Sequence, residues 1–428
     1  MSKKDVFKYL ISDFHSRELP GLIERRLKLP ETSKTISLIG PRRSGKTFYF
    51  YQLIRELEKK LVPKNKIVYI NFEDDRILPL KINDLNDLIE AYFELYPENK
   101  ARQIYFFFDE IQNIPQWEAF IRRIIDQEKA KIFITGSSSK LLSKEIATAL
   151  RGRTITFQLL PLSFKEFLEF KAIKLEKNFE YSPQRFVIKK LFEEYLLFGG
   201  FPEVAIEEPE LKQKILKEYF ELILQKDIID RFSIRNTFLL KNLVKYLITN
   251  LASIFSINSY HKIASKQSPA AKDTIMEYIS YLEDANLIHL IPIFDYSLKK
   301  QQANPKKAFC IDNGLRNAVA FTFSKDEGKL AENLAFIEFK RKEKETFYWK
   351  NKNEVDFIIK NKNNSLEAIN VSYTNEINER EINGLIEFSK TFKKTKKLTI
   401  ITKDIEKTEK LSGKTIHFIP LWKWLLKE

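Results

Sequence analysis

Short apolar runs recur along the first part of the chain and are separated by longer segments of mixed polarity. Apolar runs of this length, bounded by polar or glycine-containing turns, are typical of buried parallel strands, and the longer segments favour helices between them. The pattern therefore predicts an α/β domain in which a parallel sheet is flanked by helices. The predicted strands are 36–39, 66–72, 103–108, 131–135 and 154–157, and the helix after the first of them is Phe48–Leu57.

The first predicted strand runs directly into a loop with the pattern G-x-x-x-x-G-K-T. Such a loop surrounds nucleotide phosphates with backbone N–H groups at a helix N-terminus, which favours anions. Gly40 and Gly45 permit the required backbone angles and close approach, Lys46 would meet the β- and γ-phosphates, and Thr47 would give its hydroxyl to Mg²⁺. The sequence thus predicts binding of a nucleoside triphosphate, with the candidate residues Gly40, Pro41, Arg42, Arg43, Ser44, Gly45, Lys46, Thr47 and Phe48.

The apolar run 103–108 ends in two carboxylates, Asp109 and Glu110, as in a Walker B strand. Acids after a strand are by themselves typical of a surface loop, but behind a phosphate loop they favour catalysis of phosphoryl transfer. Asp109 would hold Mg²⁺ through its water shell, and Glu110 would orient and deprotonate the attacking water. We therefore predict an ATPase with ATP and Mg²⁺ as its ligands.

Polar residues near two later strands are further candidates for catalysis. The strand 131–135 ends at Thr135 and is followed by Ser137, and either hydroxyl could sense the γ-phosphate or position water, although a simple strand-to-turn exit gives the same pattern. A further strand (66–72) between the phosphate loop and the Walker B strand, together with this polar-tipped strand, predicts the additional-strand, AAA+-like type of P-loop NTPase. Arg151 and Arg153 precede the fifth strand, and either could be an arginine finger that reaches a neighbouring subunit, or else a solvated or structural arginine.

The pattern changes after Pro161, where Ser163 and Glu166 form a predicted capping box for the next helix. Helices follow, with a break at Phe198–Pro202, whose glycines permit a tight turn. From Asn236 a helix, a short helix, a longer helix (Pro269–Asp284) and alternating strand residues predict a winged helix. The predicted domains are a P-loop ATPase core (1–170), a helical lid or linker (171–235), a winged helix (236–325) and a small α/β domain (326–428).

Lysines on the predicted winged helix suggest phosphate contacts with DNA. The candidates lie on or near the second and third helices and in the predicted wing, although winged helices also serve as protein-docking modules. A basic stretch around Phe347, Tyr348 and Trp349 could likewise face nucleic acid or be a solvated edge. The candidate phosphate contacts are Lys262, Lys266, Lys272, Lys299, Lys300, Lys306 and Lys307.

The last domain has the skeleton of a PD-(D/E)xK nuclease, in which acids gather Mg²⁺ and a lysine activates water. Glu332 lies on a predicted helix, and Glu354 and Asp356 open a predicted strand. The next strand should end in E-x-K, but the matching residues are Asn370–Ser372. A metal-dependent nuclease is therefore the least favoured function.

Composition sets the broad class. The chain has 428 residues, 43% of them apolar, and a formal net charge of +15, which favours polyanionic partners. The single cysteine, Cys310, excludes an internal disulfide. Apolar runs are too short to span a bilayer and the N-terminus lacks the apolar core of a signal peptide, so we expect a cytoplasmic protein with no membrane partner.

The motifs in their order resemble the archaeal and bacterial AAA+-like ATPases, often called the archaeal ATPase family. That family joins a P-loop core to a winged helix and a degenerate nuclease-like domain, and the resemblance implies ATP binding and hydrolysis at Lys46, Thr47, Asp109 and Glu110. The motifs that carry it are GPRRSGKT (40–47), FFFDEIQ (106–112), TGSSS (135–139), LRGR (150–153), PLSFKEF (161–167), FGGFPE (198–203), DNGLRNA (312–318) and NEVDFII (353–359).

Two classes of function remain open at this point. The first is an ATPase whose basic domains engage DNA, so that the nucleotide cycle remodels or translocates on it. The second is a nucleotide-controlled switch that changes its docking to a protein partner, as in signalling or defence ATPases. An arginine finger acting between subunits would require a homo-oligomer.

Overall fold

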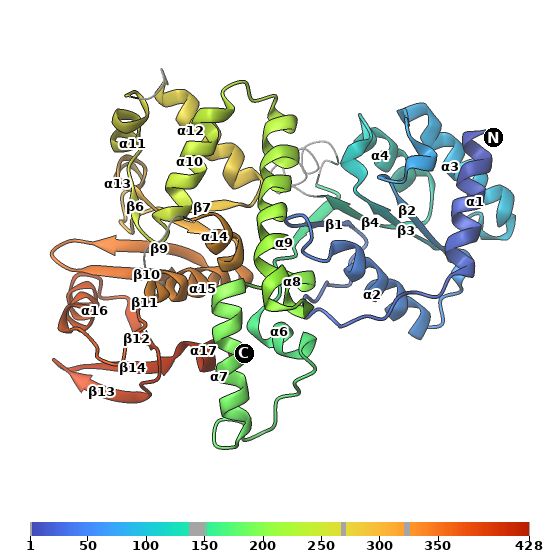
Figure 1. Cartoon of the computed structure of the whole chain (residues 1–428). Helices are drawn as coiled ribbons and strands as arrows, with labels where there is room; N and C mark the ends of the chain where they lie inside the picture. Colours follow the sequence, from blue (N-terminus) through green and yellow to red (C-terminus); the bar gives the residue numbers. More distant parts are fainter. Residues whose placement is uncertain (1, 137–149, 151, 267–270, 321–325, 428) are drawn as a thin grey trace. The chain divides into compact units, whose positions relative to one another are not determined.

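A computed structural model describes residues 2–136, 150, 152–266, 271–320 and 326–427 (Figure 1). The chain separates into two compact units, Met1–Leu159 and Leu160–Glu428. Among the described residues, no helix combines the length and the apolar character needed to cross a membrane.

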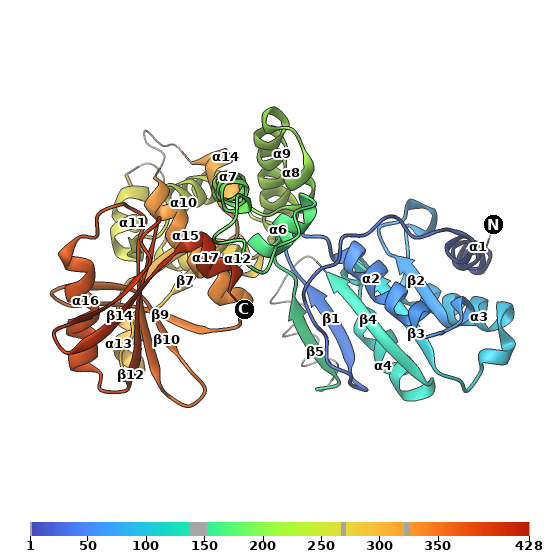
Figure 2. The same ribbon diagram turned by 90° about the horizontal axis from the view of Figure 1, so that it is seen from below.

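The first unit is built on a five-stranded sheet in the order β2-β3-β4-β1-β5 (Figure 2). All of its strand pairs are parallel, as the continuous apolar runs predict. The polar-tipped strand β4 therefore lies between the strands that carry the phosphate loop and the two carboxylates. The strands are β1 (Thr35–Ile39), β2 (Ile67–Asn71), β3 (Ile104–Asp109), β4 (Ala130–Gly136) and β5 (Thr154–Gln158).

Helices cover both faces of this sheet because alternate side chains along each strand point to opposite faces. Phe106 and Phe108 pack with α1, α3 and α4 on one face, whereas Phe107 packs with α2 on the other. The helices are α1 (Lys3–Ser16), α2 (Lys46–Lys59), α3 (Leu85–Leu95) and α4 (Trp117–Gln127), with short 3-10 segments at Lys64–Lys66, Asp75–Ile77, Ile82–Asp84, Pro97–Asn99 and Ile111–Asn113.

The second unit begins with a run of helices. The predicted capping box is confirmed, because the Ser163 hydroxyl accepts the Glu166 N–H while the Glu166 carboxylate accepts the Ser163 N–H. The predicted break at 198–202 is also confirmed, since one helix ends at Phe198 and the next begins at Pro202. The elements are α6 (Phe164–Phe170), α7 (Gln184–Phe198), α8 (Pro202–Ile206), α9 (Pro209–Leu222) and a π-helical continuation (Ile223–Asp230).

A three-stranded module follows, with the sheet order β6-β8-β7. Its third helix, α12, begins at Lys272; the predicted start at Pro269 lies outside the described residues. The connection between β7 and β8 holds a short helix, α13, where the sequence predicts a wing. The elements are α10 (Thr237–Thr249), β6 (Ile254–Phe255), α11 (Ile257–Ala264), α12 (Lys272–Asp284), β7 (Ile288–Ile291), α13 (Leu298–Ala303) and β8 (Lys306–Cys310).

The C-terminal module is a six-stranded mixed sheet in the order β13-β14-β12-β11-β10-β9. Helices α15 and α16 pack against opposite faces of it, since Phe357 and Ile358, neighbours on β10, belong to separate apolar clusters. The elements are α14 (Asn313–Val319), α15 (Glu327–Arg341), β9 (Glu345–Lys350), β10 (Glu354–Lys360), β11 (Leu366–Ser372), α16 (Glu379–Thr391), β12 (Thr395–Thr402), β13 (Lys407–Leu411), β14 (Lys414–Pro420) and α17 (Leu421–Leu426).

Three of the sequence motifs meet in the second unit. The Gly200 N–H donates to Asp312 Oδ2 at 2.7 Å, and the Gly200 carbonyl accepts the Leu162 N–H at 2.7 Å. The other Asp312 oxygen caps α14 by accepting N–H groups of Gly314 and Leu315. The motifs PLSFKEF, FGGFPE and DNGLRNA thus form one hydrogen-bonded junction, although long stretches of chain separate them.

Candidate functional site

The phosphate loop lies between β1 and α2, where the sequence places it. Gly45 precedes α2 in the left-handed region (φ 94°, ψ 24°), and Gly40 has no room for a side chain because an added Cβ would overlap the Leu159 carbonyl oxygen. The Lys46 side chain is 5% exposed, and its Nζ donates to the carbonyls of Gly40 at 3.2 Å and Pro41 at 3.3 Å. The lysine therefore points into the curve of the loop.

Asp109 lies at the centre of a cluster of hydroxyl groups from neighbouring elements. Its Oδ2 accepts from Thr47 Oγ1 at 2.7 Å and from the Tyr69 hydroxyl at 3.0 Å, and its Oδ1 accepts from Thr135 Oγ1. Burial raises the pKa of Asp109, and the charge of Glu110 adds to this, while the three hydroxyl donors oppose it. A divalent cation beside this carboxylate would favour its ionised form.

Glu110 is held in a left-handed backbone conformation (φ 52°, ψ 44°), which is unusual for a residue with a side chain. Its N–H donates to Thr135 Oγ1 at 2.9 Å, a bond that fixes this turn at the end of β3. Its Oε1 lies 3.6 Å from Lys46 Nζ, and its Oε2 accepts from Gln112 Nε2 at 2.5 Å. The two catalytic candidates, Lys46 and Glu110, are therefore in contact.

The residues at this site fit ATP and Mg²⁺. The Ser44 hydroxyl is buried and finds no hydrogen-bond partner within the described residues, which suits a loop that surrounds an anionic ligand. The Thr47 hydroxyl and the Asp109 carboxylate form a pair of oxygen ligands of the kind that Mg²⁺ prefers. The structure thus brings together the predicted residues Lys46, Thr47, Asp109 and Glu110 within one network.

Other predicted site residues lie outside this network or outside the described residues. Arg42 pairs with Glu73 at 3.4 Å, and the Phe48 side chain is 52% exposed. Ser137 and Arg151 fall in the part of the chain that the structure does not describe. Their predicted roles stay predictions.

Arg153 directly precedes β5, and its guanidinium pairs with Asp126. Its carbonyl accepts the Thr35 N–H at the start of β1, whereas the phosphate loop follows the end of β1. A strand of this length separates the two by roughly 16 Å. Arg153 can therefore act as a finger only on a neighbouring chain.

Two residues of this site were missed by the sequence reasoning. Tyr69, on β2, touches Asp109, and the buried Arg25 donates to the Ser44 carbonyl at 2.7 Å and so supports the phosphate loop. Parallel pairing places Asn71 beside Asp109. Tyr69 lies two positions earlier on β2 and therefore on the same face, so the strand pairing could have predicted its place near Asp109. No signal in the sequence singles out Arg25.

We expect Tyr69→Phe to weaken the response to Mg²⁺ because it removes one of the hydroxyls that orient Asp109. Loss of such an outer contact raises the Mg²⁺ concentration for half-maximal ATP turnover by roughly tenfold. The measurement is ATPase rate against Mg²⁺ at saturating ATP. Tyr51→Phe is the matched control, since the Tyr51 hydroxyl lies 3.5 Å from that of Tyr69, one step farther from the carboxylate. An equal effect in both variants would contradict the role given to Tyr69.

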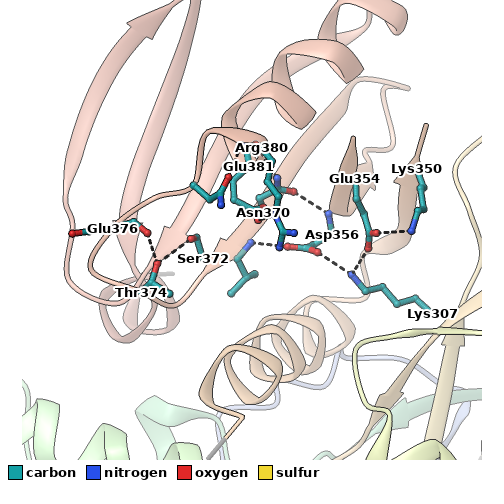
Figure 3. Close-up of polar contacts among 12 residues, drawn as sticks. Lys307, Lys350, Glu354, Asp356, Asn370, Ser372, Thr374, Glu376, Arg380 and Glu381 are labelled. Carbon is teal, nitrogen blue, oxygen red and sulfur yellow. Dashed lines mark hydrogen bonds and ion pairs between the residues drawn. The ribbon is translucent and has the colours of Figure 1, made fainter. Parts of the chain in front are cut away.

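The lysines predicted to contact DNA divide into exposed and buried positions. Lys306 is half-buried at the start of β8. Lys307 is 2% exposed and surrounded by carboxylates of the C-terminal module, so its prediction as a phosphate contact is wrong (Figure 3). The sequence placed it in a wing, but β8 is the central strand of a sheet and turns this side chain inward. The exposed candidates are Lys262, Lys266, Lys272, Lys299 and Lys300.

The aromatic residues of the basic stretch are also buried. Phe347, Tyr348 and Trp349 all lie in apolar clusters of the C-terminal module. They cannot stack on exposed bases and belong to the core, whereas contact of the neighbouring lysines with nucleic acid stays a prediction.

Comparison with known families assigns the first unit. The sequence matches the family described as AAA domain over residues 32–168. Residues 189–326 and 327–424 match two families described as domains of unknown function, DUF8612 and DUF4143. The AAA match and the parallel sheet together confirm the predicted P-loop NTPase fold of the N-terminal part. The predicted domain boundaries stay a prediction.

Comparison with solved structures gives little beyond this. The structure of the Aeropyrum pernix ORC1 protein in complex with DNA is 12% identical, covers 74% of this chain and 91% of its own, and has a TM-score of 0.35. A similarity this low carries no argument about function.

Two whole-length relatives place the chain in a family. An uncharacterized protein of Methanocaldococcus jannaschii is 37% identical over 100% of this chain and 96% of its own length. An uncharacterized protein of Haemophilus influenzae is 30% identical over 96% of this chain and 98% of its own. The chain therefore belongs to the family that contains these two proteins, and its N-terminal part, which matches the AAA domain model, has a P-loop NTPase fold.

Proposed function

We propose that this chain hydrolyses ATP in a Mg²⁺-dependent reaction and couples the nucleotide cycle to binding or remodelling of DNA. The observation that supports hydrolysis most directly is the network in which Lys46, Thr47, Asp109 and Glu110 meet. Binding alone would need only the loop, whereas a second carboxylate fixed beside the lysine suits activation of water.

Each residue of the network has a separate task in this proposal. Lys46 and the N–H groups at the start of α2 bind the phosphates, and the charge of Lys46 stabilises the transferred phosphoryl group. Glu110 orients the attacking water and accepts its proton at a carboxylate oxygen, and Thr135 fixes the backbone of Glu110. Thr47 and Asp109 would hold Mg²⁺, which supplies neutralisation of phosphate charge.

Coupling to DNA is supported by the three-stranded module. Its order of helix, strand, helix, helix, strand, short helix and strand resembles that of a winged helix, in which α12 would be the recognition helix. Lys262 and Lys266 lie on or just after α11, Lys272 opens α12, and all three are exposed. Together with the net charge of +15, they favour contact with a phosphate backbone.

The test is ATPase rate with and without single-stranded, duplex and branched DNA at several salt concentrations. We expect DNA to stimulate turnover, and Lys262→Ala combined with Lys272→Ala to abolish the stimulation with the basal rate unchanged. Lys59→Ala combined with Lys60→Ala is the matched control, because both lysines are exposed on the first unit. Turnover that ignores every DNA, with no salt-dependent binding, would remove the DNA part of the proposal.

A second candidate function is an ATP-controlled switch that docks a protein partner. It is favoured by a groove of about 320 Å³ between α10 and α11, lined in part by Phe238, Tyr246, Tyr260 and Ile263. Phe238 and Ile263 are 58% and 45% exposed, which suits an apolar ligand more than a phosphate backbone. A protein retained only in the presence of ATP, together with indifference to DNA, would favour this candidate.

Assembly and location are part of the same proposal. Action of Arg151 or Arg153 as a finger requires a neighbouring copy, so sedimentation with ATP should reveal an oligomer if either has that role. We propose a cytoplasmic site of action.

A further inference from the structure

The side chain of Lys307 leaves the three-stranded module and enters a cluster of carboxylates in the C-terminal module. Its Nζ lies 2.6 Å from Glu332 Oε1, 2.9 Å from Asp356 Oδ1 and 3.2 Å from Glu354 Oε1. Figure 3 shows Lys307 pointing at Glu354 and Asp356 from the side opposite Asn370. Three carboxylates, from α15 and β10, thus surround one buried ammonium group.

These carboxylates are the acids that give the C-terminal domain the predicted skeleton of a metal-dependent nuclease, the least favoured of the functions considered. That prediction lacked a lysine and one acid, because Asn370 and Ser372 stand at the matching positions of β11. The structure brings a lysine to the same place from residue 307, on a strand of another module. No pattern within the C-terminal segment could have revealed it.

The oxygens of Asp356 and Glu354 that a metal would need already have partners. Asp356 Oδ2 accepts the Val371 N–H at 2.9 Å, while its Oδ1 meets Lys307. Glu354 Oε2 lies 3.3 Å from Lys350 Nζ, while its Oε1 meets Lys307. Asn370, which replaces an acidic ligand, accepts the Asp356 N–H through its side-chain oxygen at 2.9 Å. Within the described residues, no group of three or more His, Cys, Asp or Glu side chains is arranged to hold a metal ion.

The charge of Lys307 also compensates that of the carboxylates without a metal. Burial alone would lower the pKa of Lys307, but Asp356, Glu332 and Glu354 outweigh it and hold that pKa well above its ordinary value. Burial raises the pKa of Glu332 to about 8, and the charge of Asp356 adds to this while Lys307 opposes it. The ammonium groups of Lys307 and Lys350 both lie against carboxylates of this cluster and offset part of their charge.

The two modules are joined next to this cluster by backbone contacts. Phe294 N–H donates to the Tyr348 carbonyl at 2.6 Å, and the Tyr348 N–H donates to the Pro292 carbonyl at 3.1 Å. The Tyr348 hydroxyl donates to the Pro305 carbonyl at 2.6 Å, two residues before Lys307. Hydrogen bonds of Tyr348 therefore join the two modules close to the point where the Lys307 side chain enters the carboxylate cluster.

We propose that the ammonium group of Lys307 takes the place of a divalent cation in this carboxylate cluster. It fastens the three-stranded module to the C-terminal module, and the intact chain binds no divalent cation there. The nuclease-like module is then a docking partner for the rest of the second unit rather than a metal enzyme.

The first experiment counts Mn²⁺ bound to the full chain by electron paramagnetic resonance without nucleotide. We expect wild type and the single variant Asp356→Asn to bind the same number of Mn²⁺ ions per chain, because no ion binds at this cluster. Lys307→Ala removes the ammonium and leaves space, so we expect it to gain one Mn²⁺ per chain, which Asp356→Asn added to it then removes. Lys306→Ala is the matched control and should behave as wild type.

Thermal unfolding gives an independent measure on the same variants. In EDTA we expect Lys307→Ala to unfold at least about 5 °C below wild type, because it leaves buried acids without their cation. Added Mn²⁺ should raise that midpoint for Lys307→Ala and leave wild type and Lys306→Ala unchanged. Lys307→Met should be as destabilised but not rescued, because its side chain fills the space that the ion needs.

A third measurement needs no variant that could fail to fold. Acetic anhydride should modify Lys307 of wild type far more slowly than the half-buried Lys306, and millimolar Mn²⁺ should not change this ratio. Faster labelling of Lys307 with Mn²⁺ would overturn the proposal, as would a wild-type Mn²⁺ site that Asp356→Asn abolishes. A folded Lys307→Ala chain that gains no Mn²⁺ would overturn it as well.

Discussion

Replacing Glu110 by glutamine is expected to lower the ATP turnover number by roughly 10²- to 10⁴-fold, the usual contribution of a general base. The glutamine would keep the length of the side chain and an oxygen for the Gln112 contact, but its amide cannot accept a proton from water. The measurement is steady-state phosphate release at saturating ATP and Mg²⁺.

Binding should respond differently from turnover in this variant. Glu110 lies 3.6 Å from Lys46, so neutralising it frees the lysine for phosphate, and we expect ATP to bind as tightly as in wild type or more tightly. Gln112→Ala is the control, because it removes a neighbour of Glu110 and should change the turnover number by less than about tenfold, below the range of a lost general base. Wild-type turnover in Glu110→Gln would exclude Glu110 as the base, and loss of ATP binding would show that the substitution damages the loop.

The second large effect concerns folding. Gly200→Ala is expected to destabilise the second unit by about 3 kcal/mol, near the upper end of what overpacking costs. An added Cβ would overlap the Leu162 carbonyl oxygen. Gly200 cannot move away, because its N–H donates to Asp312 and its carbonyl accepts the Leu162 N–H.

Urea unfolding followed by tryptophan fluorescence measures this effect, since Trp349, Trp422 and Trp424 lie in the second unit and Trp117 in the first. Gly328→Ala is the matched control. It lies in the first turn of α15, where an added Cβ has nothing within 4 Å, so we expect no loss and a gain of up to about 1 kcal/mol from helix propensity. Equal midpoints for the two variants would show that the junction tolerates a side chain.

Local patterns were sufficient for much of the candidate site. The phosphate loop, the two carboxylates after β3 and the capping box of Ser163 each depend on residues that are close in sequence, so periodicity and spacing locate them. Continuous apolar runs also predicted the parallel sheet. The lysines of the predicted winged-helix segment show the limit of this reasoning, since composition could not tell the buried Lys307 from the exposed Lys299.

The sequence by itself determined that the chain carries a phosphate loop followed by a pair of acids on a parallel sheet, because backbone geometry over a few residues dictates such motifs. Only the tertiary structure decided that Tyr69 and Thr135 orient Asp109, that three separate motifs meet around Asp312, and that Lys307 fills the carboxylate cluster. Those contacts join residues far apart in the chain. Their formation depends on how whole strands and helices pack, which no local pattern of polarity records.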